Sequence, residues 1–324
     1  MALSDLAVYS EYAYDAYTET LQQQINLFNA ATGGAIVLQG AAHQGDFSDT
    51  AFFAKIAGGT VRRRNAYGSG AVSEKHLQQL VDTSVKVAAG TPPIRLDPGQ
   101  FRWIQLNPEI AGAAMGQQLA VDSMADMLNV GLGCGYTALA QVPELVFDAT
   151  AGTDKSMSWQ NMNNAASLFG DASSRIQAWI MHSAPMHKLY DKNLQNAERL
   201  FTYGTVNVMR DPFGKLLIMT DSENLKTTAA GTTKYHALGL TSGAIMLGQN
   251  NDFDANEEAK NGDENIIRTY QAEWSYNVGL KGFAWDKQNG GKSPTDAALF
   301  SSTSWDRYAT SHKDMAGVVL DTIV

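Results

Sequence analysis

The N-terminal segment has apolar residues at the spacing of one helical face. They recur at intervals of four and three residues, at Tyr17, Leu21, Ile25 and Phe28. Residues with this spacing share one side of a helix, so the pattern predicts a helix that ends near Gly33 and Gly34. Three preceding tyrosines lie among small and acidic residues, with too little aliphatic material for a core of their own: Tyr9, Tyr12 and Tyr14. We expect this segment to pack on a neighbouring subunit or on its own chain.

The segment from about residue 40 to residue 103 changes to a period of two. Apolar and polar positions alternate from Val81 to Val87, as in a strand with one covered face. Residues 59–64 are the expected partner strand, and the prolines that follow residue 91 end the pairing, because proline cannot continue a ladder. The pattern predicts a long two-stranded ribbon. Such a ribbon is marginal alone in water, so it needs a surface to lie against.

Asn107, Pro108 and Glu109 begin the clearest helix of the chain. Proline at the first helical position and an acid in the first turn both favour a helix start. Its apolar face is predicted to consist of Ile110, Ala114, Val121, Met124 and Leu128. We expect about 20 residues, or about 30 Å of helix, before the glycines between 131 and 135 loosen it.

After Thr150 the chain alternates between helical and strand patterns. Helical spacing covers 159–169 and 188–200, and the polar stretch 250–264 is predicted to be a loop or a hairpin tip. Short apolar runs predict strands at 176–181, 216–219, 235–247, 266–274 and 278–285. With a length of 324 residues, the chain is predicted to be an α+β protein of two domains, or one large domain with subdomains.

The composition is poor in charge. Charged residues make up 18% of the chain, against about 25% in typical soluble domains. This fits an obligate oligomer, whose interfaces are large and apolar, and it fits a monomeric α+β enzyme equally well. The net charge is -9, and six acidic residues precede Lys55, the first lysine or arginine. That pattern excludes a basic nucleic-acid-binding arm and argues against a positively charged leader.

The sequence also excludes a membrane-spanning protein and a protein held together by disulfides or cysteine-bound zinc. No apolar run reaches the 18 or so residues of a membrane span, so we expect no membrane contact. Cys134 is the single cysteine, which excludes intrachain disulfides and zinc sites built from several cysteines.

Two glycine-rich segments come close to nucleotide-binding motifs. Residues 286–293, DKQNGGKS, end like a phosphate-binding loop, but Asp286 stands where the motif needs glycine and Pro294 follows where a helix must begin. Residues 131–136, GLGCGY, place Tyr136 at the third glycine of a dinucleotide fingerprint and follow a helix instead of a strand. We predict a plain turn at the first segment and a flexible break at the second.

His182 and His187 are the candidates for metal binding or catalysis. They are five residues apart with a proline between them, whereas metal-binding histidines on one helical face are four apart. Ser183, His187 and Asp171 can be written as a hydrolase triad, but no GxSxG turn exposes the serine. We expect both histidines to be polar residues at the ends of elements.

Arg62, Arg63 and Arg64 form the one compact basic cluster. On an extended ribbon they lie far from their own core, where they can contact acidic groups of an adjacent subunit. The alternative is a solvated face with no partner.

Taken in order, these elements resemble the major capsid protein of a tailed bacteriophage. The likeness is carried by the ribbon that ends in Ala89-Gly90-Thr91-Pro92-Pro93, the long helix, the run Ala178-Trp179-Ile180-Met181-His182-Ser183 and the segment Arg210-Asp211-Pro212-Phe213-Gly214-Lys215. It extends to Tyr235-His236-Ala237-Leu238-Gly239-Leu240 and Gly243-Ala244-Ile245, so it covers nearly the whole chain.

The resemblance implies the α+β fold of tailed-phage major capsid proteins (Hong Kong 97-type). Its parts are expected as an N-terminal arm at 1–40, an E-loop at 41–102, a peripheral domain with the spine helix at 103–140 and 251–324, and an axial domain at 141–250. Such chains assemble as hexamers and pentamers into an icosahedral shell around double-stranded DNA. The family implies no catalytic residue, no cofactor and no metal.

The resemblance also implies partners and a location. The expected contacts between copies involve Arg62, Arg63, Arg64, Tyr9, Tyr12 and Tyr14. The other expected partners are a separate scaffolding protein, a portal protein and, as an open question, a decoration protein. Contact with packaged DNA is expected to be weak, because the chain has a net negative charge. A basic inner wall would instead bind phosphates tightly through counterion release. The location is the virion, after assembly in the host bacterial cytoplasm. The alternatives are an encapsulin-like shell around protein cargo and a cytosolic hydrolase.

Overall fold

The computed structural model describes residues 2–40, 45–53, 61–72, 74, 79–97, 99, 102, 104, 106–193, 198–203, 206–210, 214–229, 231–261, 264 and 266–324. Within these ranges the chain forms five α-helices and two β-sheets. The helices are α1 (Ala2–Ala31), α3 (Pro108–Ala140), α4 (Trp159–Ser167), α5 (Ser183–Asn193) and α6 (Asp296–Leu299).

The first sheet is organised around one long strand, β14 (Ile267–Leu280). It pairs antiparallel with five neighbours: β3 (Gln79–Gly90), β4 (Ile94–Leu96), β12 (Ile245–Gln249), β13 (Asp254–Lys260) and β15 (Phe283–Trp285). Three further strands extend the sheet, β1 (Ile36–Gly40) beside β12, β2 (Phe47–Phe53) beside β3, and β16 (Trp305–Arg307) beside β15.

The second sheet forms the compact end of the molecule. Its path runs β5-β17-β11-β6-β9-β8-β7, with β10 beside β11. The strands are β5 (Val146–Asp148), β6 (Ile176–Met181), β7 (Glu198–Tyr203), β8 (Val206–Arg210), β9 (Leu216–Met219), β10 (Lys226–Ala229), β11 (Thr232–Thr241) and β17 (Gly317–Ile323). Its central strands β6 and β17 and the second half of β11 are almost fully buried, which gives this end a continuous core.

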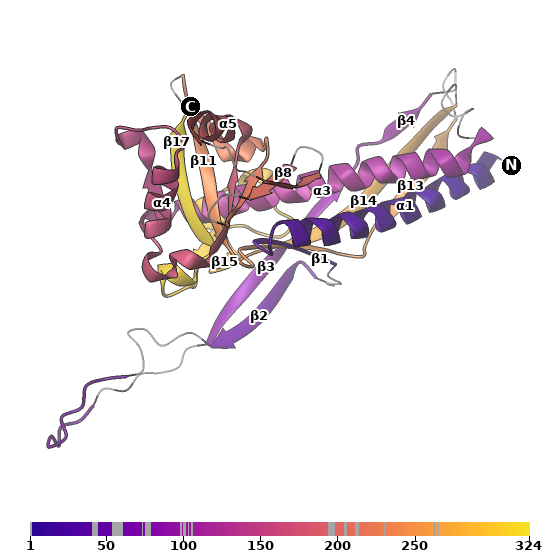
Figure 1. Cartoon of the computed structure of the whole chain (residues 1–324). Helices are drawn as coiled ribbons and strands as arrows, with labels where there is room; N and C mark the ends of the chain where they lie inside the picture. Colours follow the sequence, from indigo (N-terminus) through magenta and orange to yellow (C-terminus); the bar gives the residue numbers. More distant parts are fainter. Residues whose placement is uncertain are drawn as a thin grey trace.

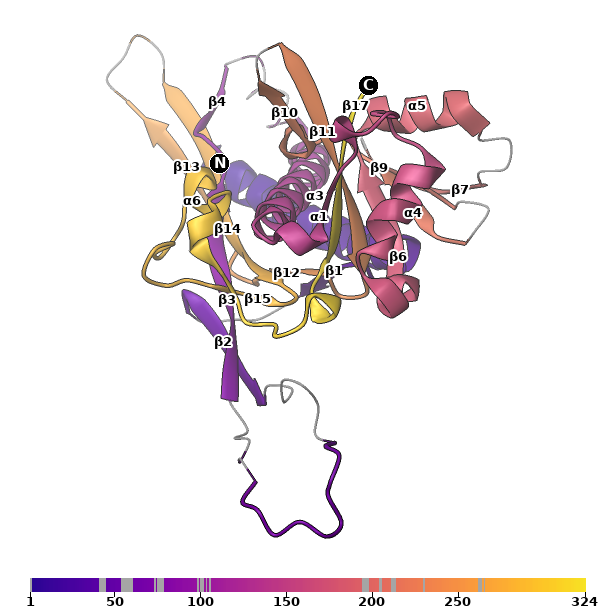
Figure 2. The same cartoon turned by 90° about the vertical axis from the view of Figure 1, so that its left-hand side faces the viewer.

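The two long helices join this compact end to an elongated arm. In Figure 1, α1 and α3 run side by side along the arm, and β13, β14 and β4 lie along the same direction. The β2–β3 ribbon leaves the body on another side, and residues 61–72 lie beyond its tip in both views (Figure 2). The molecule therefore has a packed body with two projections.

The ribbon is present, but the predicted partner strand was wrong. Strand β3 pairs with β2, with Phe47 opposite Val85 and Ser48 opposite Ser84. Residues 61–64 form no strand and are exposed, while 59–60 lie outside the described residues. Three consecutive arginines offer no apolar side chain to cover the valine face of β3, whereas the Phe47 ring packs against the hydrophobic core.

The long helix is confirmed, but it does not end at the glycines. Helix α3 has 33 residues and continues through Gly131, Gly133 and Gly135 to Ala140. A methyl group on these glycines would press against Ile245, Leu247 and Phe300. Close packing at these positions therefore outweighs the cost of glycine in a helix, which is about 1 kcal/mol per residue.

The predicted apolar face of α3 was right at two of its five residues. Met124 and Leu128 are buried, whereas Ile110, Ala114 and Val121 are exposed. Before Met124 the buried residues are Ala111, Gly112, Gly116, Leu119, Ala120 and Ser123, and all but Leu119 are small. Small side chains carry little hydrophobic signal, so the search for large apolar residues selected the wrong side of the first half of the helix.

Several later boundaries also differ from the predictions. The predicted helix 188–200 is helix α5 at 183–193 followed by strand β7, and the predicted strand 235–247 is two strands that turn at Gly243 with φ +65°. The polar stretch 250–264 contains strand β13, and β14 is one continuous strand where two were expected. The helix near 159–169 and the strands at 176–181 and 216–219 are confirmed.

Candidate functional site

The seam between α1 and α3 is built from glycine and alanine. Gly112 faces the carbonyl oxygen of Tyr9, and Gly116 faces the carbonyl oxygen of Ala13. A Cβ at either glycine would collide with that backbone, so only glycine allows the two helices to approach this closely. The seam fixes α1 on the spine and thereby positions every side chain on its outer face.

Tyrosines secure the other side of α1 to the first sheet. Tyr9 packs edge-on against Tyr270 at 5.7 Å between ring centroids, and Tyr17 stacks on Phe253 at 4.7 Å. The Tyr17 hydroxyl lies 3.3 Å from Ser123 Oγ, which ties α1 to α3 through a buried hydrogen bond. This supports packing on its own chain for part of the tyrosine-rich segment.

The three candidate tyrosines are therefore not equivalent. Tyr9 is only 4% exposed, whereas Tyr12 and Tyr14 are 40% and 45% exposed. The Tyr14 ring reaches Phe253 at 5.5 Å but keeps much of its surface in solvent. Tyr12 and Tyr14 thus offer surface to another subunit, and Tyr9 offers almost none.

A partly buried carboxyl group lies on the first sheet, near Tyr9 of α1. Glu257 on β13 is directly opposite Tyr270 on β14, and burial raises the pKa of Glu257 to about 7. Its Oε1 atom and the Tyr270 hydroxyl are both buried without a hydrogen-bond partner. Removal of water from a carboxylate disfavours its charged form, so this glutamate resists ionisation where α1 covers it.

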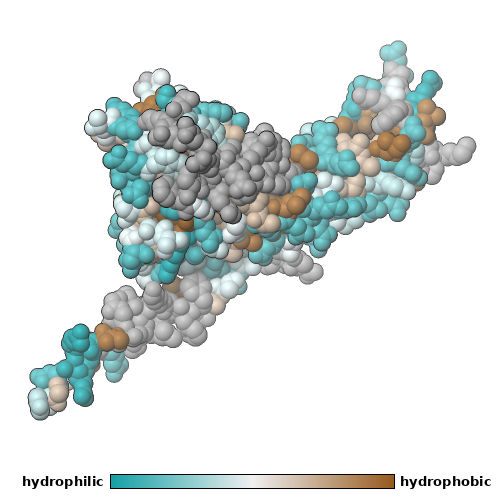
Figure 3. Space-filling view, in the orientation of Figure 1, coloured by the Kyte–Doolittle hydropathy of each residue, from teal (hydrophilic) through white to brown (hydrophobic). Residues whose placement is uncertain are grey.

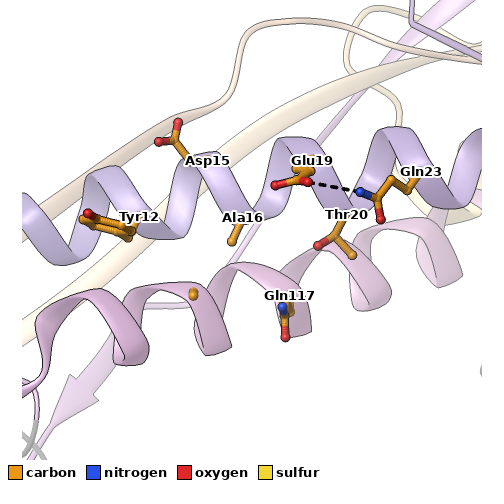
Figure 4. Close-up of a pocket in the computed structure, with 8 residues that line it drawn as sticks. Tyr12, Asp15, Ala16, Glu19, Thr20, Gln23 and Gln117 are labelled. Carbon is orange, nitrogen blue, oxygen red and sulfur yellow. Dashed lines mark hydrogen bonds between the residues drawn. The ribbon is translucent and has the colours of Figure 1, made fainter.

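An open groove runs along the outer side of the α1–α3 pair (Figure 4). It has a volume of about 410 Å³ and is lined by Tyr12, Asp15, Ala16, Glu19, Thr20, Gln23, Ala113 and Gln117. Asp15 and Glu19 project from the same side of α1, one helical turn apart, and Gln23 donates to Glu19 at 3.1 Å. The groove therefore has an acidic rim and a floor of small and polar side chains.

The root of the ribbon is held by the turn at 286–293. Lys287 Nζ lies 2.5 Å from Asp49 Oδ2, and Lys292 Nζ lies 3.3 Å from Asp46 Oδ2. Lys287 also lies over the Phe47 ring at 5.2 Å. The segment is a plain turn, as the sequence predicted, and its lysines contact carboxylates of this chain at the ribbon.

Residues 61–72 beyond the ribbon are exposed throughout. Arg62, Arg63 and Arg64 make no ion pair with any other residue in the described part of the chain. Tyr67 is fully exposed, and Val61 nearly so. This segment has no core of its own, which agrees with the expectation that the ribbon needs another surface.

The outer end of the arm also exposes apolar surface. Figure 3 shows hydrophobic residues gathered there, around the start of α3 and the end of the β13–β14 hairpin. The exposed side chains are Leu106, Ile110 and Ile266.

The Ser183, His187 and Asp171 triad that the sequence analysis argued against is not assembled. Asp171 is paired with Lys313, and the His187 ring packs edge-on against Tyr190. Ser183 Oγ lies 3.3 Å from Nδ1 of His182, its chain neighbour. His182 therefore follows the end of β6, as expected, whereas His187 lies in the interior of α5 and not at an element end.

A buried polar network that the sequence did not indicate crosses the second sheet. His236 Nδ1 lies 2.7 Å from Asp321 Oδ1, and His236 Nε2 lies 2.9 Å from Thr227 Oγ1. Lys234 bridges Asp321 and Asp148 at 3.6 and 2.9 Å. Both ring nitrogens of His236 therefore have hydrogen-bond partners. Together with the Lys234 contacts, they join β5, β17, β11 and β10. The register of distant strands brings these residues together, and no local motif could have revealed them.

No other chemistry stands out in the described ranges. No three His, Cys, Asp or Glu side chains there gather closely enough to hold a metal ion. None of the helices in those ranges combines the length and hydropathy needed to cross a bilayer. Cys134 is buried as a free thiol, and burial raises its pKa, which leaves it unreactive.

Comparisons with solved structures find bacteriophage capsid proteins of similar length. The capsid protein of Ralstonia phage GP4 superimposes with a TM-score of 0.52 at 10% sequence identity, over 91% of this chain and 88% of that chain. The cyanophage Pam1 capsid subunit gives a TM-score of 0.49 at 11% identity, over 87% and 86% of the two chains. A search of curated protein sequences finds no match.

The structural likeness establishes the tailed-phage capsid fold, in agreement with the fold predicted from the sequence. A family model covers almost the same length. The model named Gp13-like and described as major capsid protein 13-like matches residues 5–319. The chain therefore belongs to the major capsid protein 13-like family and is a structural protein of a bacteriophage capsid, which associates with copies of itself to form the shell of the virion.

Proposed function

We propose that this chain assembles as hexamers and pentamers into an icosahedral shell that encloses double-stranded phage DNA. The family match over residues 5–319 is the observation that carries the proposal. It is supported by exposed surface on two projections, residues 61–72 beyond the ribbon and the apolar side chains Leu106, Ile110 and Ile266 at the outer end of the arm. Neither projection is covered within one copy, so a shell supplies the surfaces that each requires.

The proposed division of the chain follows the expected one. The arm is residues 1–40, the E-loop 41–102, the peripheral domain 103–140 with 251–324, and the axial domain 141–250. Helix α1, the β2–β3 ribbon and helix α3 fall within the first three parts. Contacts between copies are proposed at Arg62, Arg63, Arg64, Tyr12 and Tyr14, which are exposed. Tyr9 supports such contacts from beneath, because it anchors α1 to β14.

The protein is proposed to have no enzymatic activity and to bind its DNA weakly. The net charge of -9 disfavours tight contact with phosphates. The remaining proposed partners are a scaffolding protein, a portal protein and a decoration protein, with assembly in the host bacterial cytoplasm.

Expression of the chain with and without its scaffolding protein tests the proposal. We expect negative-stain microscopy to show closed shells with the scaffold, and capsomers, tubes or aggregates without it. Light scattering is the second measurement. A stable species near the monomer mass of 35.0 kDa at micromolar concentration, unchanged by salt or precipitant, would contradict the proposal.

A further inference from the structure

The two long helices carry an uncompensated negative charge. There are four carboxylates in α1 and three in α3, and neither helix contains a lysine, arginine or histidine. Asp15 and Glu19 are exposed on the groove rim and make no ion pair within the described ranges. This face of the spine therefore presents negative charge that its own chain does not neutralise.

Residues 61–72 have the opposite character. They contain three arginines and no acidic residue, and the arginines are exposed without an ion-pair partner among the described residues. In Figures 1 and 2 this segment lies away from α1 and α3, on the far side of the ribbon. It cannot reach the groove of its own copy, so any contact between the two must join different copies.

The spacing of the charges also matches. Carboxylates four residues apart on a helix are separated by about 6 Å along its axis. Alternate side chains of an extended segment are separated by about 6.6 Å on one side. In an extended conformation, Arg62 and Arg64 can therefore face Asp15 and Glu19 together, with Arg63 on the other side. Guanidinium groups bind carboxylates through paired hydrogen bonds, which adds geometric selectivity to the attraction.

We propose that the segment Arg62–Arg64 of one copy docks on the groove between α1 and α3 of a second copy, with Asp15 and Glu19 as its acceptors. Tyr12 at the end of the groove offers an exposed ring on which an arginine can stack. The inference rests on the proposed shell and specifies which surfaces meet within it.

Charge exchange tests the pairing. Arg62→Glu with Arg64→Glu, or Asp15→Arg with Glu19→Arg, places like charges together and is expected to raise the critical concentration for assembly about tenfold, equivalent to about 1.4 kcal/mol. All four substitutions in one chain restore opposite charges and are expected to bring assembly back to near the wild-type concentration. Wild-type assembly is expected to weaken with salt, because exposed ion pairs are screened.

The control is Asp306→Arg compared with Glu19→Arg. Both replace one exposed acidic residue, but Asp306 lies on β16, away from the groove. We expect only Glu19→Arg to raise the critical concentration. Wild-type behaviour of the Asp15→Arg, Glu19→Arg variant, or failure of the fourfold variant to recover while circular dichroism shows it folded, would overturn the pairing.

Cross-linking gives a second test that needs no change in charge at the groove. Copies with Arg63→Cys are mixed with tagged copies with Thr20→Cys, assembled, and treated with a short bismaleimide. The native Cys134 is buried and does not compete. We expect a cross-linked pair of one tagged and one untagged copy, and none when Thr153→Cys replaces Thr20→Cys.

Shells that form without this cross-link would remove the groove as the docking surface and leave the proposed function standing. Failure of the wild-type chain to form any shell would instead overturn the proposed function.

Discussion

The α1–α3 seam and the segment 61–72 both reach the surface, yet they are built in opposite ways. The seam is tightly packed, with Gly112 and Gly116 against the backbone of α1 and Tyr17 bonded to Ser123. Residues 61–72 contact no core, and their arginines have no partner in the described chain. The comparison separates a region that stabilises one copy from a region that has no partner among the described residues of that copy.

The largest effect is expected where α3 enters the core. Leu128 is 5% exposed, whereas Val121, on the face once predicted to be apolar, is 38% exposed. Leu128→Ala is expected to lower the free energy of unfolding by about 2 to 5 kcal/mol. Val121→Ala is the control and is expected to cost less than about 1 kcal/mol. Urea denaturation of unassembled protein measures both, and equal losses would contradict the observed register of α3.

The seam itself provides the next prediction. Gly116→Val puts a branched side chain against the Ala13 carbonyl oxygen and is expected to cost about 1 to 3 kcal/mol of unfolding free energy through overpacking. Ala114→Val introduces the same residue on the exposed side of α3 and serves as the control. If the two variants unfold at the same denaturant concentration, close approach of the helices is not what requires glycine.

The third prediction concerns pH and Glu257. Its pKa rises from an ordinary value of 4.5 to about 7, so the folded state holds the proton more tightly than the unfolded state. Its stabilising contribution is complete below about pH 4.5 and is lost as the pH rises through about 7. The change is expected to be about 1 kcal/mol or less, because solvent screens this partly buried group.

Glu257→Gln is expected to flatten this dependence. Comparing the denaturation midpoints of wild type and variant at about pH 5 and about pH 8 isolates the contribution of the carboxyl group. A wild-type midpoint that rises with pH between these values, with no such rise in the variant, would reverse the sign of the argument.

The smallest effect is expected at the ribbon root. Lys287→Ala removes an ion pair with Asp49 that is partly exposed, so it is expected to change stability by only about 0 to 1 kcal/mol. Faster hydrogen exchange in β2 is the expected signature, because the ribbon loses one of its two lysine contacts. Lys260→Ala, on exposed β13, is the control. Unchanged exchange in β2 would show that Lys287 does not hold the ribbon.

Local patterns predicted the elements whose stability comes from their own periodicity. The helix around Tyr17, the start of α3 at Pro108 and the strand Leu216–Met219 are examples. Strand β13 could not be predicted, because its sequence DANEEAK is mostly polar and is held as a strand by pairing with β14. The continuation of α3 through Gly133 depends on Phe300, which is far away in the sequence.

Surface features were likewise predictable only where the signal is local in the sequence. The exposed cluster Arg62–Arg64 was predictable, since three adjacent charges rarely enter a core. The contact between Lys287 and Asp49 joins residues 238 positions apart, and no local signal marks either of them. Asp15 and Glu19 form the rim of a groove only because α1 packs on α3, so the sequence alone could not indicate this surface.

Strand β14 has a mechanical consequence for a shell. Its 14 residues run without a break from the outer hairpin, where they pair with β13, to the root of the ribbon, where they pair with β3. A pull on the outer hairpin therefore passes along one covalent backbone and loads the adjacent ladders in shear, with many hydrogen bonds sharing the force. Tension applied at one projection therefore reaches the base of the other without crossing a loop.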